Sequence, residues 1–313
     1  MPRRRLRPLV VVGLTATLAG AALAAHPAPA GNAIAADTVA LRRTLDSLVA
    51  RHRGVVAYSI KNLETGERLN RRGDESFPTA SLIKVAILVT LYDLVERKRI
   101  SLDDRLTLLR IDKVPGAGLL QYLHDGAELT VADAAWLMIS ISDNTATNLL
   151  LDRIVIRRVW EKMDSLGLRR TRVHHKSFVR EFSSVVPDSS LKYGLGTSTP
   201  DESVRLFELL ATGRAVNPRA DSAMLHILEH NEDDELLQRF AAGVPAAHKT
   251  GAGDSVRTEC SLWRLPDRVV ACVYTNANAD TRWILDSEPQ LLMARMGEAI
   301  VRAWQPPAHR NLR

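Results

Sequence analysis

Alternation of apolar and polar positions near both ends of the chain predicts β-strands. Residues 56–60 alternate in this way, and a turn at 64–67 leads to a short returning strand at 68–70. A second pair of such segments, 259–265 and 268–275, is joined by a Pro-Asp turn. These are the signals of two β-hairpins. We therefore predict one antiparallel sheet built from both ends of the chain.

Helical periodicity flanks and separates these strands. Asp37 is a candidate N-cap for a helix over 37–49, and a second helical pattern runs over 288–304. Residues 81–94 are nearly all apolar, which predicts a buried helix that is too short to span a bilayer. Helical patterns continue to about residue 210.

Strands at both ends with helices between them predict an α/β (α+β) fold. We expect one domain over 37–313. Its α/β part comprises about 37–75 and 215–313, and an all-α subdomain over about 76–214 is inserted between them.

The N-terminus has the pattern of a secretory signal peptide. Four arginines within residues 1–8 precede an apolar run, Leu9–Ala25, with a small-residue cleavage site at 22–24. We predict a signal peptide over 1–24 and a tether over 25–36. The protein would then be exported, periplasmic or secreted, with no stable membrane span after cleavage. An uncleaved anchor is the alternative, and the adjacent arginines leave both the Sec and the twin-arginine routes open.

Charge and cysteine content exclude several classes of partner. The chain has 42 Lys and Arg and 36 Asp and Glu, a net charge of +6. The predicted signal peptide carries four of the basic residues and none of the acidic ones, so the mature chain would carry only +2. No basic block interleaved with aromatic residues remains, and we expect no nucleic-acid partner. Two cysteines are too few for a zinc site made of four thiolates, and we expect no metal and no cofactor.

A serine and a lysine open the buried helix. Ser81 and Lys84 are three residues apart and so share a helix face. A serine hydroxyl is a weak nucleophile and needs an adjacent base. Burial disfavours the charged form of a lysine, so its amine gains basicity at ordinary pH. The pair can thus supply a nucleophile and its base.

Two further short motifs carry polar chemistry. Ser142-Asp143-Asn144 follows an apolar helical segment, where a second serine can relay a proton and an amide can hold the lysine and a substrate carbonyl. Lys249-Thr250-Gly251 precedes the late hairpin, where it offers a cation, a hydroxyl and an open backbone. Each motif alone is also typical of an ordinary turn. The ordered set of three is rare by chance.

This order is that of active-site-serine β-lactamases and penicillin-binding proteins. The sequence resembles the class A β-lactamase superfamily over nearly all of the chain after about residue 37. Further segments similar to the family are 77–80, 101–108, 128–152, 198–200 and 248–253. The resemblance implies a β-lactamase/transpeptidase-like fold and a monomeric, cofactor-free serine hydrolase that opens the β-lactam ring through an acyl-serine intermediate.

The resemblance also implies a role for each motif residue. Ser81 would be the acylated nucleophile and Lys84 its general base or proton relay. Ser142 would protonate the leaving nitrogen, and Asn144 would position the substrate amide. The backbone N–H groups of Ser81 and Ala252 would form the oxyanion hole. The residues implied to bind the substrate, and in particular its carboxylate, are Lys249, Thr250, Gly251 and Arg257.

One part of the family pattern is missing. Between Leu168 and Thr197 the family's β-lactamases carry a Glu-x-x-x-Asn loop that holds the deacylating water, and residues 169–196 contain no Asn. Their two carboxylates are Glu181 and Asp188. Glu181 is therefore the candidate deacylation base, and slow deacylation is expected because a base must reach the water it activates.

Two other functions use the same residues. A D,D-peptidase or esterase would apply the acyl-serine chemistry to peptidoglycan-like or ester substrates. A non-catalytic penicillin-binding or sensor module would acylate once and stop.

Other patterns have less specific interpretations. His226-x-x-Glu229-His230 matches an inverted zinc-protease motif, but an exposed helix is the expected structure. His174 and His175 are expected on a loop surface. A two-residue turn between the late strands would place Cys260 and Cys272 on opposite faces, so we expect two buried free thiols. A three-residue loop would align them and permit a disulfide.

Overall fold

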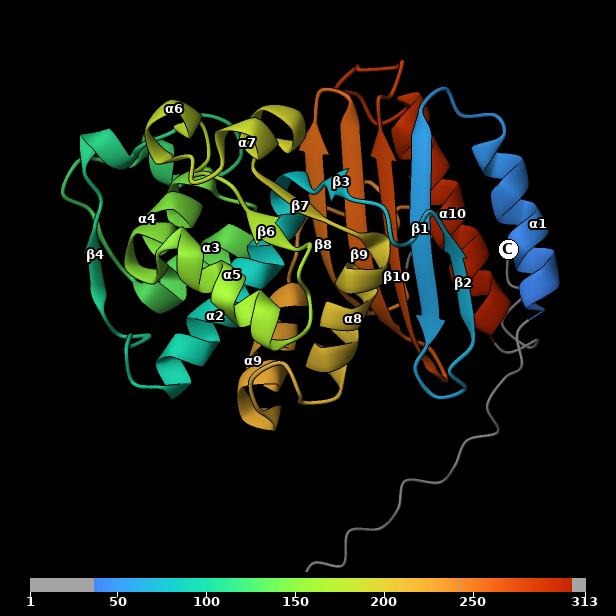
Figure 1. Ribbon diagram of the computed structural model, residues 1–313, viewed down its shortest axis with the longest axis horizontal. Coiled ribbons are helices and arrows are strands. Elements are labelled where there is room, and N and C mark those ends of the chain that lie inside the picture. The colour runs from blue at the N-terminus through green and yellow to red at the C-terminus, as the bar shows by residue number, and fades with distance from the viewer. Residues whose placement is uncertain (1–36, 242, 306–313) are drawn as a thin grey trace, which may run out of the picture. The chain divides into compact units, whose positions relative to one another are not determined.

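A five-stranded antiparallel sheet joins the two ends of the domain (Figure 1). The computed structural model describes residues 37–241 and 243–305, so the predicted signal peptide and tether lie outside the described residues. The strand order is β2-β1-β10-β9-β8. The strands are β1 (Val55–Asn62), β2 (Arg68–Arg71), β8 (Ala246–Gly253), β9 (Val256–Arg264) and β10 (Arg268–Asn276). Val55 of β1 lies opposite Asn276 of β10, which confirms the predicted sheet built from both ends.

Hydrophobic cores cover both faces of this sheet. Successive residues of a strand point to opposite faces. On β10, Ala271 and Val273 belong to one core, whereas Cys272 and Tyr274 belong to the other. Both faces of the sheet are therefore buried, and several polar side chains that its strands carry, such as Lys249 and Glu259, are buried with them.

The two terminal helices cover one face, α1 (Thr38–Val49) and α10 (Glu288–Trp304), and they pack on each other (Figure 1). The Asp37 carboxylate caps α1 by accepting the backbone N–H of Ala40 at 2.9 Å. Leu41 and Leu45 are one turn apart and both are buried against the sheet. The helices predicted at both ends of the domain are therefore present.

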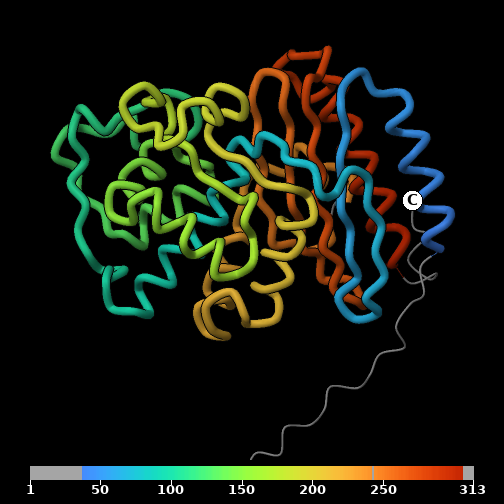
Figure 2. Tube along the Cα trace, viewed as in Figure 1, coloured from blue at the N-terminus to red at the C-terminus, as the bar shows by residue number. Residues whose placement is uncertain are grey.

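The remaining helices follow one another between β2 and β8 along the chain, and most lie beside the sheet (Figure 2). α8 packs on the sheet face opposite α10 and contacts β1 and β10. α2 is buried on nearly all sides, as its apolar sequence predicts. Among the residues that the structure describes, no helix has the length and hydrophobicity needed to cross a bilayer. These helices are α2 (Lys84–Glu96), α3 (Val131–Ser140), α4 (Asn144–Ile154), α5 (Ile156–Ser165), α6 (Arg180–Ser183), α7 (Pro187–Tyr193), α8 (Pro200–Ala211) and α9 (Pro218–Leu228).

Short elements connect the sheet to the helices. Two small antiparallel sheets have the orders β3-β7-β6 and β4-β5. The strands are β3 (Phe77–Pro78), β4 (Arg105–Thr107), β5 (Glu128–Thr130), β6 (Arg172–Val173) and β7 (Gly196–Ser198). The 3-10 turns are η1 (Ala80–Ile83), η2 (Arg110–Asp112) and η3 (Leu120–Tyr122). β3 and η1 carry the chain from β2 into α2.

Cys260 and Cys272 form a disulfide, so the expectation of two free thiols is wrong. The loop between β9 and β10 has three residues, 265–267, because Arg264 lies opposite Arg268. This register places Cys260 directly opposite Cys272, and both side chains point to the same face of the sheet.

Candidate active site

Ser81 lies in η1, the 3-10 turn that runs directly into α2. Residues three apart eclipse each other in a 3-10 helix, so Ser81 and Lys84 lie on one face. Ser81 is half-buried and Lys84 is fully buried. Ala80, just before the serine, has a φ of 44°, a left-handed conformation that costs energy in a non-glycine residue. The nucleophile candidate thus sits at a sharp entry to a buried helix.

The amine nitrogen of Lys84 is held by neutral acceptors only. Nζ donates to the backbone carbonyl of Ser142 at 2.6 Å, to Ser142 Oγ at 3.1 Å and to Asn144 Oδ1 at 3.0 Å. Burial, and then the positive charge of Lys249, lower the pKa of Lys84 well below its ordinary value of 10.5, against the opposing charge of Asp143. An amine that releases its proton so readily can act as a base.

The connection between α3 and α4 supplies these acceptors. Ser142 has a φ of 58°, and Asp143 is the N-cap of α4, where it accepts the backbone N–H of Ala146 at 2.8 Å. The other carboxylate oxygen of Asp143 accepts the backbone N–H groups of Leu119 and Leu120 at 2.7 and 2.9 Å. Asp143 therefore orders the connection, and the residues on either side of it reach Lys84.

Strand β8 passes η1 so closely that only glycine is accommodated at position 251. A Cβ atom on Gly251 would lie 2.4 Å from the carbonyl oxygen of Thr79 and 2.8 Å from the backbone nitrogen of Leu82. The Thr258 hydroxyl on β9 donates to the same Thr79 carbonyl at 2.7 Å. β8 is also an edge strand of the sheet, so part of its backbone is left unpaired by the sheet. The Lys-Thr-Gly motif thus lies beside the turn that carries Ser81.

Lys249 and Thr250 occupy this part of β8, and both are buried. The Lys249 amine donates to the carbonyl of Thr250 at 3.0 Å, and the Thr250 hydroxyl donates to Asp233 Oδ2 at 2.6 Å. Burial lowers the pKa of Lys249 to about 8, while the charges of Asp233 and Glu259 act in the opposite direction. Lys249 is therefore a second buried lysine at the site, and it has carboxylates as neighbours.

Arg257 lies on β9 opposite Ala252 of β8, and its guanidinium is bound by backbone carbonyls. One Nη atom donates to the carbonyls of Gly253 and Val256, the second contact at 2.8 Å. The other Nη donates to the carbonyl of Arg282 at 3.4 Å.

A buried charge network behind Lys249 is absent from the sequence motifs. His248 Nδ1 lies 2.9 Å from Glu259 Oε1, and Nε2 lies 3.3 Å from Asp234 Oδ1. Burial alone would lower the pKa of His248, but the hydrogen bonds and charges of Asp234 and Glu259 outweigh burial and raise the pKa to about 9. His248 is therefore a cation at neutral pH, and it fastens β8 to the segment that follows α9.

One feature of the sequence could have indicated this network. Glu259 is an acidic residue at the start of a strand that the sequence predicts, and a fully buried carboxylate requires partners. It also accepts the backbone N–H of Leu237 at 2.6 Å and the hydroxyl of Ser261 at 2.9 Å. The partners could not be identified because they are distant in sequence.

Glu181, the candidate deacylation base, lies on the short helix α6 and is exposed. Among the described residues, no hydrogen bond or ion pair joins its carboxylate to Ser81, Lys84 or Ser142. Its role stays a prediction.

His174 and His175 are buried, so their expected place on a loop surface is wrong. His174 Nδ1 lies 3.0 Å from the carbonyl of Gly194, and its Nε2 lies 3.2 Å from the hydroxyl of Thr197. Burial lowers the pKa of both imidazoles. Their hydrogen bonds hold the segment between β6 and β7 together.

The zinc-protease pattern lies at the end of α9. The imidazoles of His226 and His230 pack edge to face with centroids 4.6 Å apart, and both contact the indole of Trp136. Glu229 forms an ion pair with Arg264. Within the described part of the chain, no group of three His, Cys, Asp or Glu side chains is placed to hold a metal ion.

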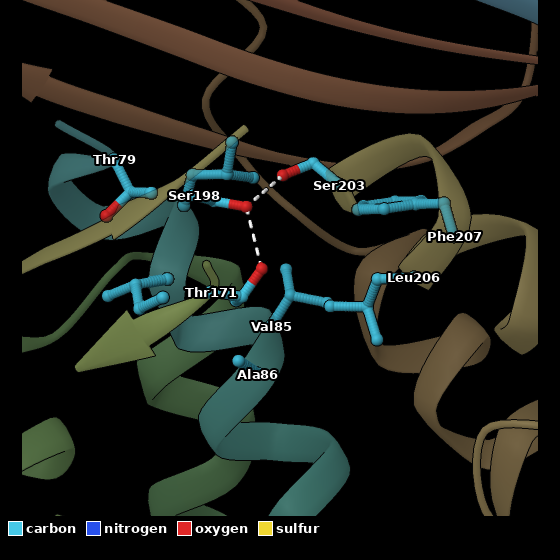
Figure 3. Close-up of a pocket in the computed structure, with 10 residues that line it drawn as sticks. Thr79, Val85, Ala86, Thr171, Ser198, Ser203, Leu206 and Phe207 are labelled. Carbon is cyan, nitrogen blue, oxygen red and sulfur yellow. Dashed lines mark hydrogen bonds between the residues drawn. The ribbon is translucent and has the colours of Figure 1, made fainter. Parts of the chain in front are cut away.

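A small pocket lies between α2 and α8 (Figure 3). Val85 and Ala86 of α2 face it from one side and Leu206 and Phe207 of α8 from another. A chain of hydroxyl hydrogen bonds crosses it from Thr171 Oγ1 to Ser198 Oγ at 2.8 Å and on to Ser203 Oγ at 3.0 Å. None of the motif residues that carry charge lines this pocket.

The chain matches known proteins over most of its length. A family model described as the β-lactamase enzyme family matches residues 40–304. The chain is 30% identical over 267 residues to a β-lactamase from Streptomyces cellulosae, which is 82% of each sequence.

Solved structures show the same fold. A β-lactamase from Sphaerobacter thermophilus is 29% identical, with a TM-score of 0.76 over 87% of this chain and 100% of that one. A mutant of PBP-A, in an acyl-enzyme complex with penicillin G, is 27% identical, with a TM-score of 0.73 over 85% of this chain and 96% of that one.

Proposed function

Because the chain belongs to the β-lactamase enzyme family, within the class A superfamily of serine β-lactamases, we propose that Ser81 is the residue it acylates when it opens a β-lactam. The predicted family, fold and β-lactamase activity are confirmed, and the residue roles are our proposal. One observation supports the proposed residue roles. The buried amine of Lys84 is bound to Ser142 and Asn144 within one 3-10 turn of Ser81.

In the acylation step, proton transfers link Ser81, Lys84, Ser142 and the leaving nitrogen, and they return Lys84 and Ser142 to their starting states. Ser81 Oγ attacks the lactam carbonyl carbon as its proton passes to Lys84, which is the base in its neutral form. An amine with two N–H bonds donates to two of the three acceptors and has a lone pair for the proton. The carbon–nitrogen bond breaks, and the leaving nitrogen takes the proton of the Ser142 hydroxyl. Lys84 Nζ, 3.1 Å from Ser142 Oγ, then returns the proton to Ser142 and becomes neutral again.

Backbone and amide groups complete this part of the site. Asn144 fixes the Lys84 amine through Oδ1 and positions the substrate amide. The backbone N–H groups of Ser81 and Ala252 form the oxyanion hole that stabilises the tetrahedral intermediate. The close approach of β8 to η1 at Gly251 supports this pairing, because it brings the two backbones side by side.

Three residues of β8 and β9 form a binding place for a substrate group next to the scissile bond, which we call the carboxylate cradle: Lys249, Thr250 and Arg257. Gly251 leaves the strand backbone open to the substrate. The cations would attract a carboxylate.

We further propose that deacylation is slower than acylation. Glu181 is the candidate base for the deacylating water, but it is exposed and residues 169–196 lack a Glu-x-x-x-Asn sequence. The penicillin G acyl-enzyme of PBP-A supports the acylation half of the proposal for a protein of this fold.

Colour and intact mass, followed together after mixing with a chromogenic cephalosporin, test the proposal. We expect a burst of colour with a Ser81 adduct, followed by slow turnover. A single burst with a permanent adduct would instead favour a penicillin-binding or sensor module. Cleavage of a D-Ala-D-Ala peptide or an ester, with no reaction of the cephalosporin, would favour a D,D-peptidase or esterase.

Two variants locate the chemistry. Ser81→Ala should abolish labelling by a fluorescent penicillin, and equal labelling would refute the proposal. Glu181→Gln should slow adduct loss without slowing adduct formation, if Glu181 is the deacylation base. Asp188→Asn, which neutralises the other carboxylate of residues 169–196, is the matched control and should leave both rates unchanged.

We also propose that the protein is exported as a monomer after removal of residues 1–24. The disulfide between Cys260 and Cys272 supports export, because disulfides persist in oxidising compartments. N-terminal sequencing of the protein recovered from outside the cytoplasm tests the cleavage site. Light scattering during gel filtration tests the monomer.

A further inference from the structure

The donors of the carboxylate cradle are already bound to protein acceptors. Lys249 Nζ donates to the carbonyl of Thr250, and the Thr250 hydroxyl donates to Asp233. The Arg257 guanidinium donates to three backbone carbonyls. An incoming carboxylate must therefore compete with existing hydrogen bonds in the cradle.

Asp233 is the acceptor in the cradle that carries a charge. Its Oδ2 lies 2.6 Å from Thr250 Oγ1, a short distance typical of a hydroxyl bound to an ionised carboxylate. Burial lowers the pKa of Lys249, and the negative charge of Asp233 is the first of the charges that oppose this lowering. At Arg257 the charges of Asp254 and Asp280 oppose burial ahead of Asp233. Thr250 and Lys249 therefore have the Asp233 carboxylate as a close neighbour.

The loop that carries Asp233 is fixed on both sides. The backbone N–H of Glu232 donates to the carbonyl of Ser140 at 2.9 Å, next to the Ser142 connection. The carboxylate of Glu235 accepts a hydrogen bond from Gln290 at 3.0 Å. Asp233 itself is partly buried, and its Oδ1 accepts the backbone N–H of Glu235 at 3.3 Å. These contacts hold the Asp233 carboxylate in the cradle.

We propose that Asp233 is a specificity-determining residue that disfavours acyl donors with a free carboxylate beside the scissile bond and favours those in which this group is uncharged, such as an ester or amide. The proposal rests on the function proposed above. An anionic group entering the cradle meets the Asp233 carboxylate at close range, whereas an uncharged group avoids this repulsion and can still accept from the Lys249 amine.

A matched pair of substrates tests the proposal directly. The probes are a chromogenic cephalosporin with its free carboxylate and the methyl ester of the same compound, and the readout is the second-order rate constant of acylation. Asp233→Asn keeps an acceptor for Thr250 and removes the charge. We expect it to accelerate acylation by the acid roughly 10-fold and to change acylation by the ester less than twofold.

Glu232→Gln is the control for this substitution. It removes the same charge from an exposed neighbour on the same loop, and the ratio of acid to ester rates should stay that of the wild type. Asp233→Ser is a second variant in case the amide disturbs folding, because its small hydroxyl can also accept from Thr250. An unchanged acid-to-ester ratio in folded Asp233→Asn and Asp233→Ser proteins would overturn the proposal.

A binding measurement separates this proposal from the one on which it rests. In a Ser81→Ala background, calorimetry gives the affinity for the acid and the ester without chemistry. Asp233→Asn should tighten binding of the acid roughly 10-fold and leave the ester unchanged. If the wild type forms no adduct with either compound, the proposed acylation fails, and the affinities in the Ser81→Ala background still decide the role of Asp233.

Discussion

Two fully buried lysines of the site, one on a helix and one on a strand, have different surroundings. Lys84, at the start of α2, is hydrogen-bonded to a carbonyl, a hydroxyl and an amide oxygen, all of them neutral groups. Lys249, on β8, has Asp233 and Glu259 as charged neighbours. Burial lowers the pKa of both amines. At Lys84 the positive charge of Lys249 lowers the pKa further and Asp143 opposes the lowering, whereas at Lys249 both Asp233 and Glu259 oppose burial and the pKa is about 8.

This difference in charged neighbours suits the two lysines to different roles, Lys84 as a base and Lys249 as a cation. No carboxylate is among the hydrogen-bond partners of the Lys84 amine, and burial and the charge of Lys249 lower its pKa well below 10.5, so Lys84 is suited to take a proton from Ser81. Nearby carboxylates stabilise the charged form, so Lys249 is suited to act as a cation toward the substrate. Burial alone would not have separated the two roles.

The largest expected effect comes from removing the base. Lys84→Met should slow acylation by about 10²–10⁴-fold because Ser81 loses its proton acceptor. Lys249→Met should mainly raise KM or weaken binding and should cost less in the acylation step. The measurement is the burst rate with a chromogenic cephalosporin, with exposed Lys192→Met as the control. Equal losses of acylation rate in the two buried-lysine variants would contradict the comparison.

The next effect concerns how closely β8 approaches η1. Gly251→Ala should destabilise the protein by about 1–3 kcal/mol and slow acylation, because its Cβ would overlap the Thr79 carbonyl. Gly253→Ala, two residues along the same strand, is the matched control, because its Cβ would make an ordinary contact at 3.8 Å with Val256. Urea unfolding and the burst rate are the measurements. Equal behaviour of the two variants would show that the close approach is unimportant.

A third effect, on stability and not on acylation, is the pH dependence of the network behind Lys249. Since the pKa of His248 is raised from 6.5 to about 9, its contribution to stability is complete below about pH 6.5 and is lost as the pH rises through about 9. Between these values the native state holds a proton that the unfolded chain has released, so the contribution falls by up to about 1.4 kcal/mol per pH unit.

Urea unfolding at pH 6, 8 and 9.5 measures this dependence. Lys249 has a lowered pKa and acts with the opposite sign, so the difference between the wild type and His248→Gln carries the test. We expect the wild type to lose stability relative to His248→Gln as the pH rises. A difference that is constant with pH would contradict a charged His248.

Local patterns predicted most of the elements well. The alternation at 56–60 and the apolar run at 81–94 are visible because each is a property of consecutive residues. The turn between β9 and β10 was the exception. One extra loop residue reversed the relation of Cys260 to Cys272, and sequence alone does not fix loop length to one residue.

Pairings between distant residues were not predictable. The buried states of His174 and His175 depend on partners such as Gly194 and Thr197, and no short motif connects them. The Asp233–Thr250 hydrogen bond is similar, because the acidic run 233–235 is typical of a solvated surface.

The sequence by itself determined the family, the antiparallel sheet made from both ends of the domain, and the chemical groups available at Ser81, Lys84 and Lys249. Those properties follow from residue types and short spacings. Only the tertiary structure decided which lysine has neutral partners, that the two cysteines are joined, and that Asp233 lies against the carboxylate cradle. The physical reason is that pKa values and specificity depend on charges and hydrogen bonds within a few ångströms, and folding brings those groups together from distant parts of the chain.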